Sequence, residues 1–415
     1  MRNNWLRSYE HGVLTNQRPN EEIMRSYHSV LALSAVLSAV GCTEDKSPTG
    51  PGNTSAPELS ATAAATLVFR AISAGEDHSC GVTTTNVAYC WGNNFSGQLG
   101  VGSAVFSNQL VPVAVAGGLR FRNVSVGDSH SCGVTTDDHA YCWGSGAVGD
   151  GTSERRYTPV AVSGNLSFRL VRAGAGHTCG ITTANVAYCW GNNNFGQLGN
   201  YSHISRLSPV KVGGGLAWRW VSPGQLHTCG VTTSSKAYCW GRNFEGQLGV
   251  SGISSKSSPI AVGGSLSIRD IESGVFHTCA VTTANRAYCW GSGSSGQLGD
   301  GTLTTRSTPR PVAGTLQFKN VSAAGVYSCG LTIGGQGYCW GTNVQGSLGD
   351  GTISNHYTPN ALAGALILTQ LSAGSAHSCG VTATGRGYCW GYNHNGQLGD
   401  GTTTRRTSPV PVAGS

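Results

Sequence analysis

The chain has 415 residues, of which 62 are glycine and only 11% are charged, with a formal net charge of +7. Lys and Arg are spread along the chain without a run of five or six, which argues against a nucleic-acid-binding tail. The many Gly, Thr, Ser, Val and Tyr residues favour short strands joined by tight turns over long amphipathic helices.

The first 65 residues have the features of an export and anchoring region. Residues 30–40 form an apolar run that follows Arg25 and is too short to span a bilayer, and small residues lead from it to Gly41 and Cys42. This segment resembles a bacterial lipoprotein signal in which Cys42 becomes the lipidated first residue, although a buried hydrophobic helix is the alternative. Met24 makes a better start than Met1, and the residues after Cys42 have little to bury. The expected division is residues 1–23 as upstream of the true start, 24–41 as a lipoprotein-type signal peptide, 42–65 as a flexible tether and 66–415 as the folded domain.

From about residue 66 the chain repeats with a period near 50 residues. An Ala/Gly-Tyr-Cys-Trp-Gly motif occurs seven times, with Trp at 91, 143, 190, 240, 290, 340 and 390. A second Cys stands ten residues before the motif Cys, giving the pairs Cys80/Cys90, Cys132/Cys142, Cys179/Cys189, Cys229/Cys239, Cys279/Cys289, Cys329/Cys339 and Cys379/Cys389. The fifteenth cysteine is Cys42, so no thiol is left over.

Each Cys pair frames an expected β-hairpin. In the first repeat, pairing Thr83 with Val87 around a three-residue loop places Cys80 directly opposite Cys90. The last residue of such a loop is left-handed, which suits Gly, Asn or Asp. That position holds Asn86, Asp138, Asn185, Ser235, Asn285, Gly335 and Gly385, so six of the seven residues suit it.

Two further strand-like segments complete each repeat. One precedes the hairpin, as in residues 69–75, and the other is a Pro-Val-Ala-Val type segment at 112–115, 159–162, 209–212, 259–262, 309–312, 359–362 and 409–412. Four short strands per repeat without a crossover helix predict an all-β, seven-bladed β-propeller with about 50 residues per blade. Because the first strand has no Pro-Val-Ala-Val segment before it, we expect the C-terminal strand to complete the first blade and close the ring.

The repeats resemble those of the regulator of chromosome condensation family across nearly all of residues 66–415. The resemblance rests on His-Ser-Cys-Gly-Val-Thr at 78–83, Ala-Tyr-Cys-Trp-Gly at 88–92 and Gly-Gln-Leu-Gly-Asp-Gly-Thr at 396–402. It implies the propeller fold but leaves function open, because that family includes a nucleotide exchange factor, ubiquitin-ligase modules, a plant light receptor and secreted enzyme inhibitors.

Residues that recur in every repeat are interpreted first as scaffold. The Cys pairs could be zinc ligands, buried thiols or disulfides, and cross-strand pairing in an exported protein favours disulfides, whereas intracellular relatives carry Cys here as a small buried residue. The repeated Trp residues are expected to pack the blades, with a ligand-stacking platform as the alternative. The Asp of the Gly-Asp-Gly-Thr motifs (Asp150, Asp300, Asp350 and Asp400) are expected to form turns, not calcium loops.

Two sets of repeated cationic or titratable residues have competing interpretations. A histidine two residues before the first Cys, at 78, 130, 177, 227, 277 and 377 with Tyr327 in the sixth repeat, could bind metal, but a hydrogen-bonding role between strands is favoured. A basic residue precedes the outer-strand Pro by three positions at Arg156, Arg206, Lys256, Arg306, His356 and Arg406. It could attract an acidic partner or an anionic glycan, and a structural bridge is favoured.

Functional residues are therefore sought where the repeats differ. The loops before the Pro-Val-Ala-Val segments vary most, and the candidate partner-binding residues in them are Phe106, Tyr157, Tyr201, His203, Tyr357, Arg155 and Arg405. No nucleophile elbow, phosphate-binding loop or isolated acid–base pair is present, so we expect no catalysis, cofactor or metal.

The predicted function is an extracytoplasmic, monomeric scaffold that binds another protein, touches a membrane only through its lipid anchor and does not bind nucleic acid. The chain is expected to be exported and lipid-anchored to the cell envelope, in the outer membrane if the source is Gram-negative, and otherwise secreted. A lectin-like carbohydrate-binding propeller is the alternative, and its sites should recur in each blade. Nucleotide exchange on a small GTPase is less favoured, because export removes the cytosolic partner.

Overall fold

The structure, a computed structural model, describes residues 66–103 and 105–415. The interpretations of residues 1–65, namely the start at Met24, the signal peptide, the lipidated Cys42 and the tether, concern residues outside this part. Among the described residues, no helix is both long and apolar enough to cross a membrane.

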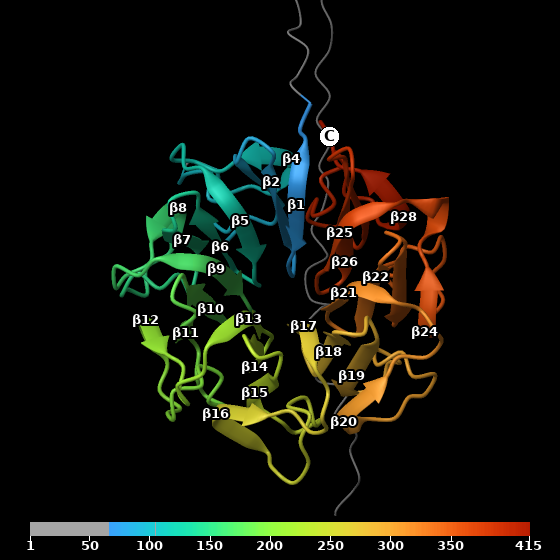
Figure 1. The fold of residues 1–415 in the computed structure, drawn as a ribbon. Coiled ribbons are helices and arrows are strands. Elements are labelled where there is room, and N and C mark those ends of the chain that lie inside the picture. Colours follow the sequence, from blue (N-terminus) through green and yellow to red (C-terminus); the bar gives the residue numbers. More distant parts are fainter. Residues whose placement is uncertain (1–65, 104) are drawn as a thin grey trace, which may run out of the picture. The chain divides into compact units, whose positions relative to one another are not determined.

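The described residues fold into seven four-stranded antiparallel sheets, and each sheet is one blade of a propeller (Figure 1). Consecutive strands pair in order, so blade 1 is β1–β4, blade 2 is β5–β8, and blade 7 is β25–β28. The all-β seven-bladed prediction is confirmed.

Four kinds of strand make up each blade, from the central channel outwards. The innermost strands are β1 (Phe69–Ala74), β5 (Phe121–Val126), β9 (Phe168–Ala173), β13 (Trp218–Pro223), β17 (Ile268–Ser273), β21 (Phe318–Ala323) and β25 (Leu368–Ala373). The second strands are β2 (His78–Thr83), β6 (His130–Thr135), β10 (His177–Thr182), β14 (His227–Thr232), β18 (His277–Thr282), β22 (Tyr327–Thr332) and β26 (His377–Thr382). The third strands are β3 (Ala88–Gly92), β7 (Ala140–Gly144), β11 (Ala187–Gly191), β15 (Ala237–Arg242), β19 (Ala287–Gly291), β23 (Gly337–Gly341) and β27 (Gly387–Gly391). The outer strands are β4 (Gln109–Ala114), β8 (Arg156–Ala161), β12 (Arg206–Lys211), β16 (Ser255–Ala261), β20 (Arg306–Pro311), β24 (His356–Ala361) and β28 (Arg406–Pro411), and a 3₁₀ turn, η2 (Ala363–Ala365), follows β24.

The hydrophobic core lies between blades. Cys80, Val82 and Cys90 of blade 1 share one buried cluster with Phe121 and Trp143 of blade 2, and each of the other seams repeats the arrangement. The Trp residues of the repeated motif are fully buried there, so their predicted packing role is confirmed. Since each blade supplies half of two seams, a single blade cannot bury its apolar surface alone.

The predicted closure of the ring by strand exchange is wrong. The C-terminal strand β28 pairs with β27 and stays in blade 7, while β4 completes blade 1. The seam between blades 7 and 1 closes by packing, with Phe69, Ile72 and Trp91 of blade 1 in one cluster with residues of blade 7. Closure by the C-terminal strand requires the outer strand of a blade to precede its innermost strand in the chain. In every blade the outer strand instead follows the hairpin of the second and third strands.

The hairpin loops between second and third strands adopt the predicted left-handed conformation. Cys80 lies opposite Cys90, as expected. The last loop residue has positive φ in every blade, including Ser235 at 62°, the one residue that did not suit the position. In blade 3 the equivalent Asn185 also accepts a hydrogen bond from Arg169 at 3.1 Å, whereas Ser235 receives a longer one from Arg219 at 3.4 Å.

Replacing Ser235 by Asn is expected to raise the free energy of unfolding by about 0.5–1 kcal/mol, because Asn tolerates positive φ better than Ser. Urea unfolding of the full chain measures the change. The matched control is Asn185→Ser in blade 3, which should lower the stability by a similar amount. Equal stability of both variants and the wild type would contradict the argument.

Candidate functional site

The cysteines of each predicted pair are at disulfide distance. The sulfur atoms lie 2.04–2.13 Å apart across the second and third strands of each blade, and all of these side chains are buried. The pairs are Cys80–Cys90, Cys132–Cys142, Cys179–Cys189, Cys229–Cys239, Cys279–Cys289, Cys329–Cys339 and Cys379–Cys389, which is the pairing expected from the sequence. A protein with this many paired cysteines suggests folding in an oxidising compartment.

No group of three or more His, Cys, Asp or Glu side chains suited to a metal ion occurs in residues 66–103 and 105–415. Each cysteine is paired with the cysteine on the neighbouring strand, for example Cys142 with Cys132 and Cys339 with Cys329. The cysteines therefore belong to the scaffold of the blades.

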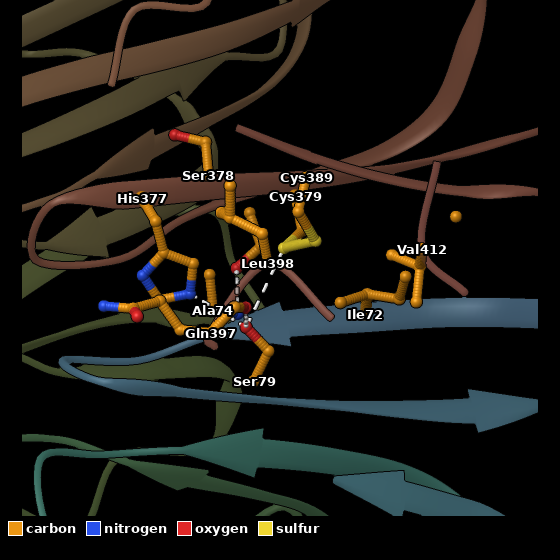
Figure 2. The surroundings of a disulfide bond; sticks show 12 residues. Ile72, Ala74, Ser79, His377, Ser378, Cys379, Cys389, Gln397, Leu398 and Val412 are labelled. Atoms are coloured by element: carbon orange, nitrogen blue, oxygen red, sulfur yellow. Dashed lines mark hydrogen bonds between the residues drawn. A yellow bond between two sulfur atoms is a disulfide. The ribbon is translucent and has the colours of Figure 1, made fainter. Parts of the chain in front are cut away.

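The repeated histidines link neighbouring blades, not strands of one blade. At the seam in Figure 2, His377 Nε2 lies 2.8 Å from Ser79 Oγ of the next blade, and Ser79 Oγ donates to the Gln397 carbonyl at 2.9 Å. Trp91 Nε1 donates to the same carbonyl at 2.9 Å. The equivalent pairs are His78–Ser131, His130–Thr178, His177–Thr228, His227–Thr278 and His277–Ser328, with Tyr327–Ser378 at the sixth seam.

This arrangement sets the protonation state of the histidines. A hydroxyl has one proton, and Ser79 gives it to a carbonyl, so His377 must donate from Nε2, while its buried Nδ1 has no hydrogen-bond partner among the described residues, which disfavours a second proton there. Burial lowers the pKa of His377 to about 3, and the pKa of His130 to about 4. The seam histidines therefore have a structural role, as favoured from the sequence, but as links between blades.

The repeated basic residues on the outer strands mostly serve their own turns. Arg156 pairs with Asp150 at 2.6 Å, and Thr152 donates to the same carboxylate. Burial alone would raise the pKa of Asp150, but the bonds from Thr152 and Arg156 outweigh it and lower the pKa. The same pairs form at Asp300–Arg306, Asp350–His356 and Asp400–Arg406, so the turn and structural interpretations are confirmed there.

The two ends of the propeller differ in exposed apolar side chains. We call the end formed by the β1–β2 and β3–β4 type connections the loop face, and the end formed by the β2–β3 hairpins and the blade-to-blade connections the hairpin face. Exposed large apolar residues of the loop face are Phe95, Phe106, Tyr201, Ile204, Phe244, Leu303, Val326, Val344 and Ile353. Those of the hairpin face are Val68, Ile333 and Ile367. Apolar side chains on the surface concentrate where a protein forms interfaces.

The structure does not bring the predicted partner-binding residues into one cluster. Phe106 and Tyr157 do meet, edge to face, with ring centroids 5.5 Å apart across blades 1 and 2. Tyr157 also packs against Gly97 and Tyr357 against Gly296 of the preceding blade, so both tyrosines help to fill seams.

The other candidates are distributed around the ring. Tyr201 and His203 lie exposed in blade 3. Arg155 and Arg405 each donate to a backbone carbonyl of the preceding blade, those of Phe95 and Val344, at 3.0 Å.

Sequence reasoning missed an aromatic pocket on the loop face. Phe195, Arg242, Phe244 and Phe276 line a cavity of about 470 Å³ together with the Gln225 turn. The Phe195 and Phe244 rings meet edge to face at 6.0 Å, and the Arg242 guanidinium lies 4.8 Å from the Phe244 ring and 5.1 Å from the Phe276 ring. The signal was available: Arg242 stands where other repeats carry Asn, Ser, Thr or Tyr.

Beside the pocket, the inner-strand turns form the mouth of the central channel. Glu76 and Asp128 lie on its rim in blades 1 and 2, and Asp77 is adjacent. Burial, and then repulsion by Glu76 and Asp77, raises the pKa of Asp128 to about 7. Burial and then Asp77 also raise the pKa of Glu76. No salt bridge reaches Glu76, Asp77 or Asp128 from any described residue.

The channel below the mouth carries charges that break the repeat. Ser occupies one inner position in most blades, but Arg172 and Glu272 replace it in blades 3 and 5 and pair at 2.6 Å. Arg172 also lies over the Trp220 ring at 4.8 Å. Burial raises the pKa of the neighbouring Asp270 to about 7, with repulsion by Glu272 as the second cause. The Arg172–Glu272 ion pair therefore links blades 3 and 5.

Comparison with known proteins agrees with the repeat analysis. A family model described as RCC1-like domain matches residues 26–325, well over half of the chain. Models of the regulator of chromosome condensation (RCC1) repeat match residues 368–397 and 384–415.

The similar proteins share the fold and little sequence. The ultraviolet-B receptor UVR8 of Arabidopsis thaliana is 34% identical over 84 residues, which are 20% of this chain and 19% of the receptor, so the match spans about a fifth of that relative. Human WBSCR16 superposes with a TM-score of 0.71 at 22% identity, covering 79% of this chain and 94% of that one. Prp20p of Saccharomyces cerevisiae superposes with a TM-score of 0.69 at 20% identity, covering 83% and 87%. At these identities the structural likeness shows the fold alone.

Proposed function

Because the chain belongs to the RCC1-like domain family, a fold that presents loops on a rigid ring, we propose that it is a non-catalytic scaffold that binds another protein outside the cytoplasm. The observation that carries the proposal is the concentration of exposed apolar side chains on the loop face. Loops held by a rigid scaffold are common recognition surfaces, and aromatic residues often supply the binding energy of an interface.

The cysteine pairs support a location outside the cytoplasm, since disulfides persist in oxidising compartments. The first described residues lie on the hairpin face, where the Leu67 N–H donates to the Gly414 carbonyl at 2.5 Å.

A protein partner fits the exposed residues better than a carbohydrate. Sugar sites on a repeat protein should recur, but the exposed aromatics differ between blades: Phe95 and Phe244 occupy a position that is Asn194, Ser294 or Val344 elsewhere. The yeast propeller Prp20p has binding properties to Gsp1p and histones, which are proteins. Nucleotide exchange is not favoured here, since an exported propeller would not meet a cytosolic GTPase.

Site-specific photo-crosslinking in cells tests the proposal. A benzophenone amino acid placed at Leu303 or Ile353, both exposed on the loop face, is expected to give a discrete protein adduct in the envelope fraction. An excess of untagged wild-type chain should compete the adduct away.

The matched controls are Ile333 and Ile367, which are similarly exposed on the hairpin face and should give no such adduct. Equal adducts from both faces, or none from the loop face, would refute the assigned face and the protein-binding role. Mass spectrometry of the same fractions is expected to find a diacylglycerol-modified Cys42 as the first residue, and an unprocessed N-terminus would remove the extracytoplasmic part of the proposal.

A further inference from the structure

The aromatic pocket is a preformed cavity that lies open on the loop face. Phe244 is 61% exposed, although it packs edge to face on Phe195 and receives Arg242 on its ring. Arg242 is held by Glu245 at 2.8 Å, so the pocket's charge is already balanced. An apolar cavity with aromatic walls and a neutralised rim suits a large apolar side chain of a partner.

The channel mouth is adjacent to this pocket and has the opposite character. Ala175 and Gln225 line both cavities, so one partner segment can contact the two. Of the mouth carboxyls, Asp77 receives a hydrogen bond of 3.4 Å from Gln397, and no cationic side chain pairs with Glu76 or Asp128 among the described residues. Their mutual repulsion would be relieved by a cation from outside the chain.

We propose that the loop face binds a partner protein through a segment that places an aromatic side chain in the Phe195–Phe244–Phe276 pocket and a lysine or arginine over Glu76 and Asp128. The apolar cavity supplies affinity, and the acidic rim supplies orientation and salt dependence. This inference rests on the proposed protein-binding function and names the chemistry of the partner.

The test uses random twelve-residue peptides displayed on phage and selected on the full-length oxidised chain, without removing clones that bind any variant. The selected peptides are expected to carry an aromatic residue and a Lys or Arg. For synthetic versions, fluorescence anisotropy should show about tenfold weaker binding to Phe244→Ala, and similar weakening by Asp128→Asn. Binding should also weaken as salt is raised.

Matched peptides assign each contact. Replacing the peptide's aromatic residue by Ala should weaken binding to the wild type and have little further effect on Phe244→Ala, and replacing its Lys by Gln should behave likewise with Asp128→Asn. Asp128→Asn removes repulsion, so it should retain or raise thermal stability while weakening binding, which separates a docking role from a folding role.

Several outcomes would overturn the inference: failure to select any peptide, peptides that lack a cation or an aromatic residue, binding that additivity shows to be independent of Phe244 and Asp128, or binding of an uncharged polysaccharide in the pocket. The variant Ile333→Ser on the hairpin face should bind like wild type. Because the crosslinking positions Leu303 and Ile353 lie outside the pocket, adducts there combined with failed peptides would reject this inference and leave the proposed function intact.

Discussion

Reducing the disulfides is expected to unfold the propeller at room temperature. Each bridge closes a loop with a sequence separation of 10, and the chain-entropy model assigns about 2.7 kcal/mol to such a bridge. The bridges lie in different blades, so their contributions should add, to about 19 kcal/mol for the full set. This exceeds the roughly 5–15 kcal/mol by which a typical domain is stable. Circular dichroism and urea unfolding with and without reductant measure the effect.

Two double variants separate the cross-link from packing. Cys379→Ala with Cys389→Ala removes the bridge of blade 7, and Cys229→Ala with Cys239→Ala removes that of blade 4. The loop lengths are equal, so each double variant should be about 2.7 kcal/mol less stable than the wild type when both are oxidised, and a larger loss in one of them would measure the packing lost with its two sulfur atoms. Two results together would contradict the disulfides and the compartment inferred from them. In the native wild-type protein all thiols would react with an alkylating agent, and reductant would not change the free energy of unfolding.

The sequence predicted the local geometry well because that geometry repeats. Cys80 opposite Cys90 follows from loop length and the two-residue alternation of a strand, and Asn86 signals the left-handed position. The same register brings Cys189 opposite Cys179 and Cys289 opposite Cys279. Seven copies of one pattern made the blade count unambiguous. The repeat did not determine which strand begins a blade, because a circular pattern can be divided between any two strands. The prediction placed the outer strand before the innermost strand, whereas each blade begins with its innermost strand.

The candidate site was harder to predict, since it depends on which blades are neighbours and on which loops of those blades contact one another. Phe195, Phe244 and Phe276 come from three different repeats and look like isolated aromatics in the sequence. Tyr157 and Tyr357 were predicted as partner-binding residues, but each packs against a glycine of the preceding blade, and only Tyr357 stays exposed, at 40%. Hydrogen bonding by the repeated histidines was predicted correctly, but the partner was not. The partner hydroxyl belongs to the next blade, about 50 residues away in the sequence, as for His177 and Thr228 at a separation of 51.

Acid is expected to unfold the propeller steeply between about pH 6 and pH 4. The buried seam histidines have folded pKa values of about 3 to 4, for example His177 at about 3, below the value of about 6.5 in an unfolded chain. Above about pH 6.5 the histidines are neutral in both states and do not lower the free energy of unfolding. Below that pH the unfolded chain binds protons that the folded chain does not bind, so the free energy of unfolding falls as the pH drops. Each histidine contributes a slope of about 1.4 kcal/mol per pH unit.

Two buried carboxyls act with the opposite sign over the same range. Asp128 and Asp270 have pKa values raised to about 7, so between about pH 4 and pH 7 they hold protons in the folded chain that they lose on unfolding. They offset about two of the six histidine protons, and the raised pKa values of Glu76 and Asp77 act in the same direction. The net slope should therefore not exceed about four protons, or about 5 kcal/mol per pH unit, measured as the urea-unfolding free energy from pH 7 to pH 5.

The protein itself offers the variant that isolates one histidine. Blade 6 carries Tyr327 at the histidine position, and its hydroxyl donates to the His377 carbonyl at 2.7 Å while contacting Ser378 at 2.9 Å. Burial raises the pKa of Tyr327, so this seam takes up no proton in acid. His177→Tyr should therefore reduce the slope by about one proton, or about 1.4 kcal/mol per pH unit, whereas His203→Tyr at the exposed histidine should leave it unchanged. An unchanged slope in His177→Tyr would mean that the seam histidine already carries its proton in the folded state. Its Nε2 hydrogen bond to Thr228 would then persist with Nδ1 charged and buried, where the structure offers that atom no partner.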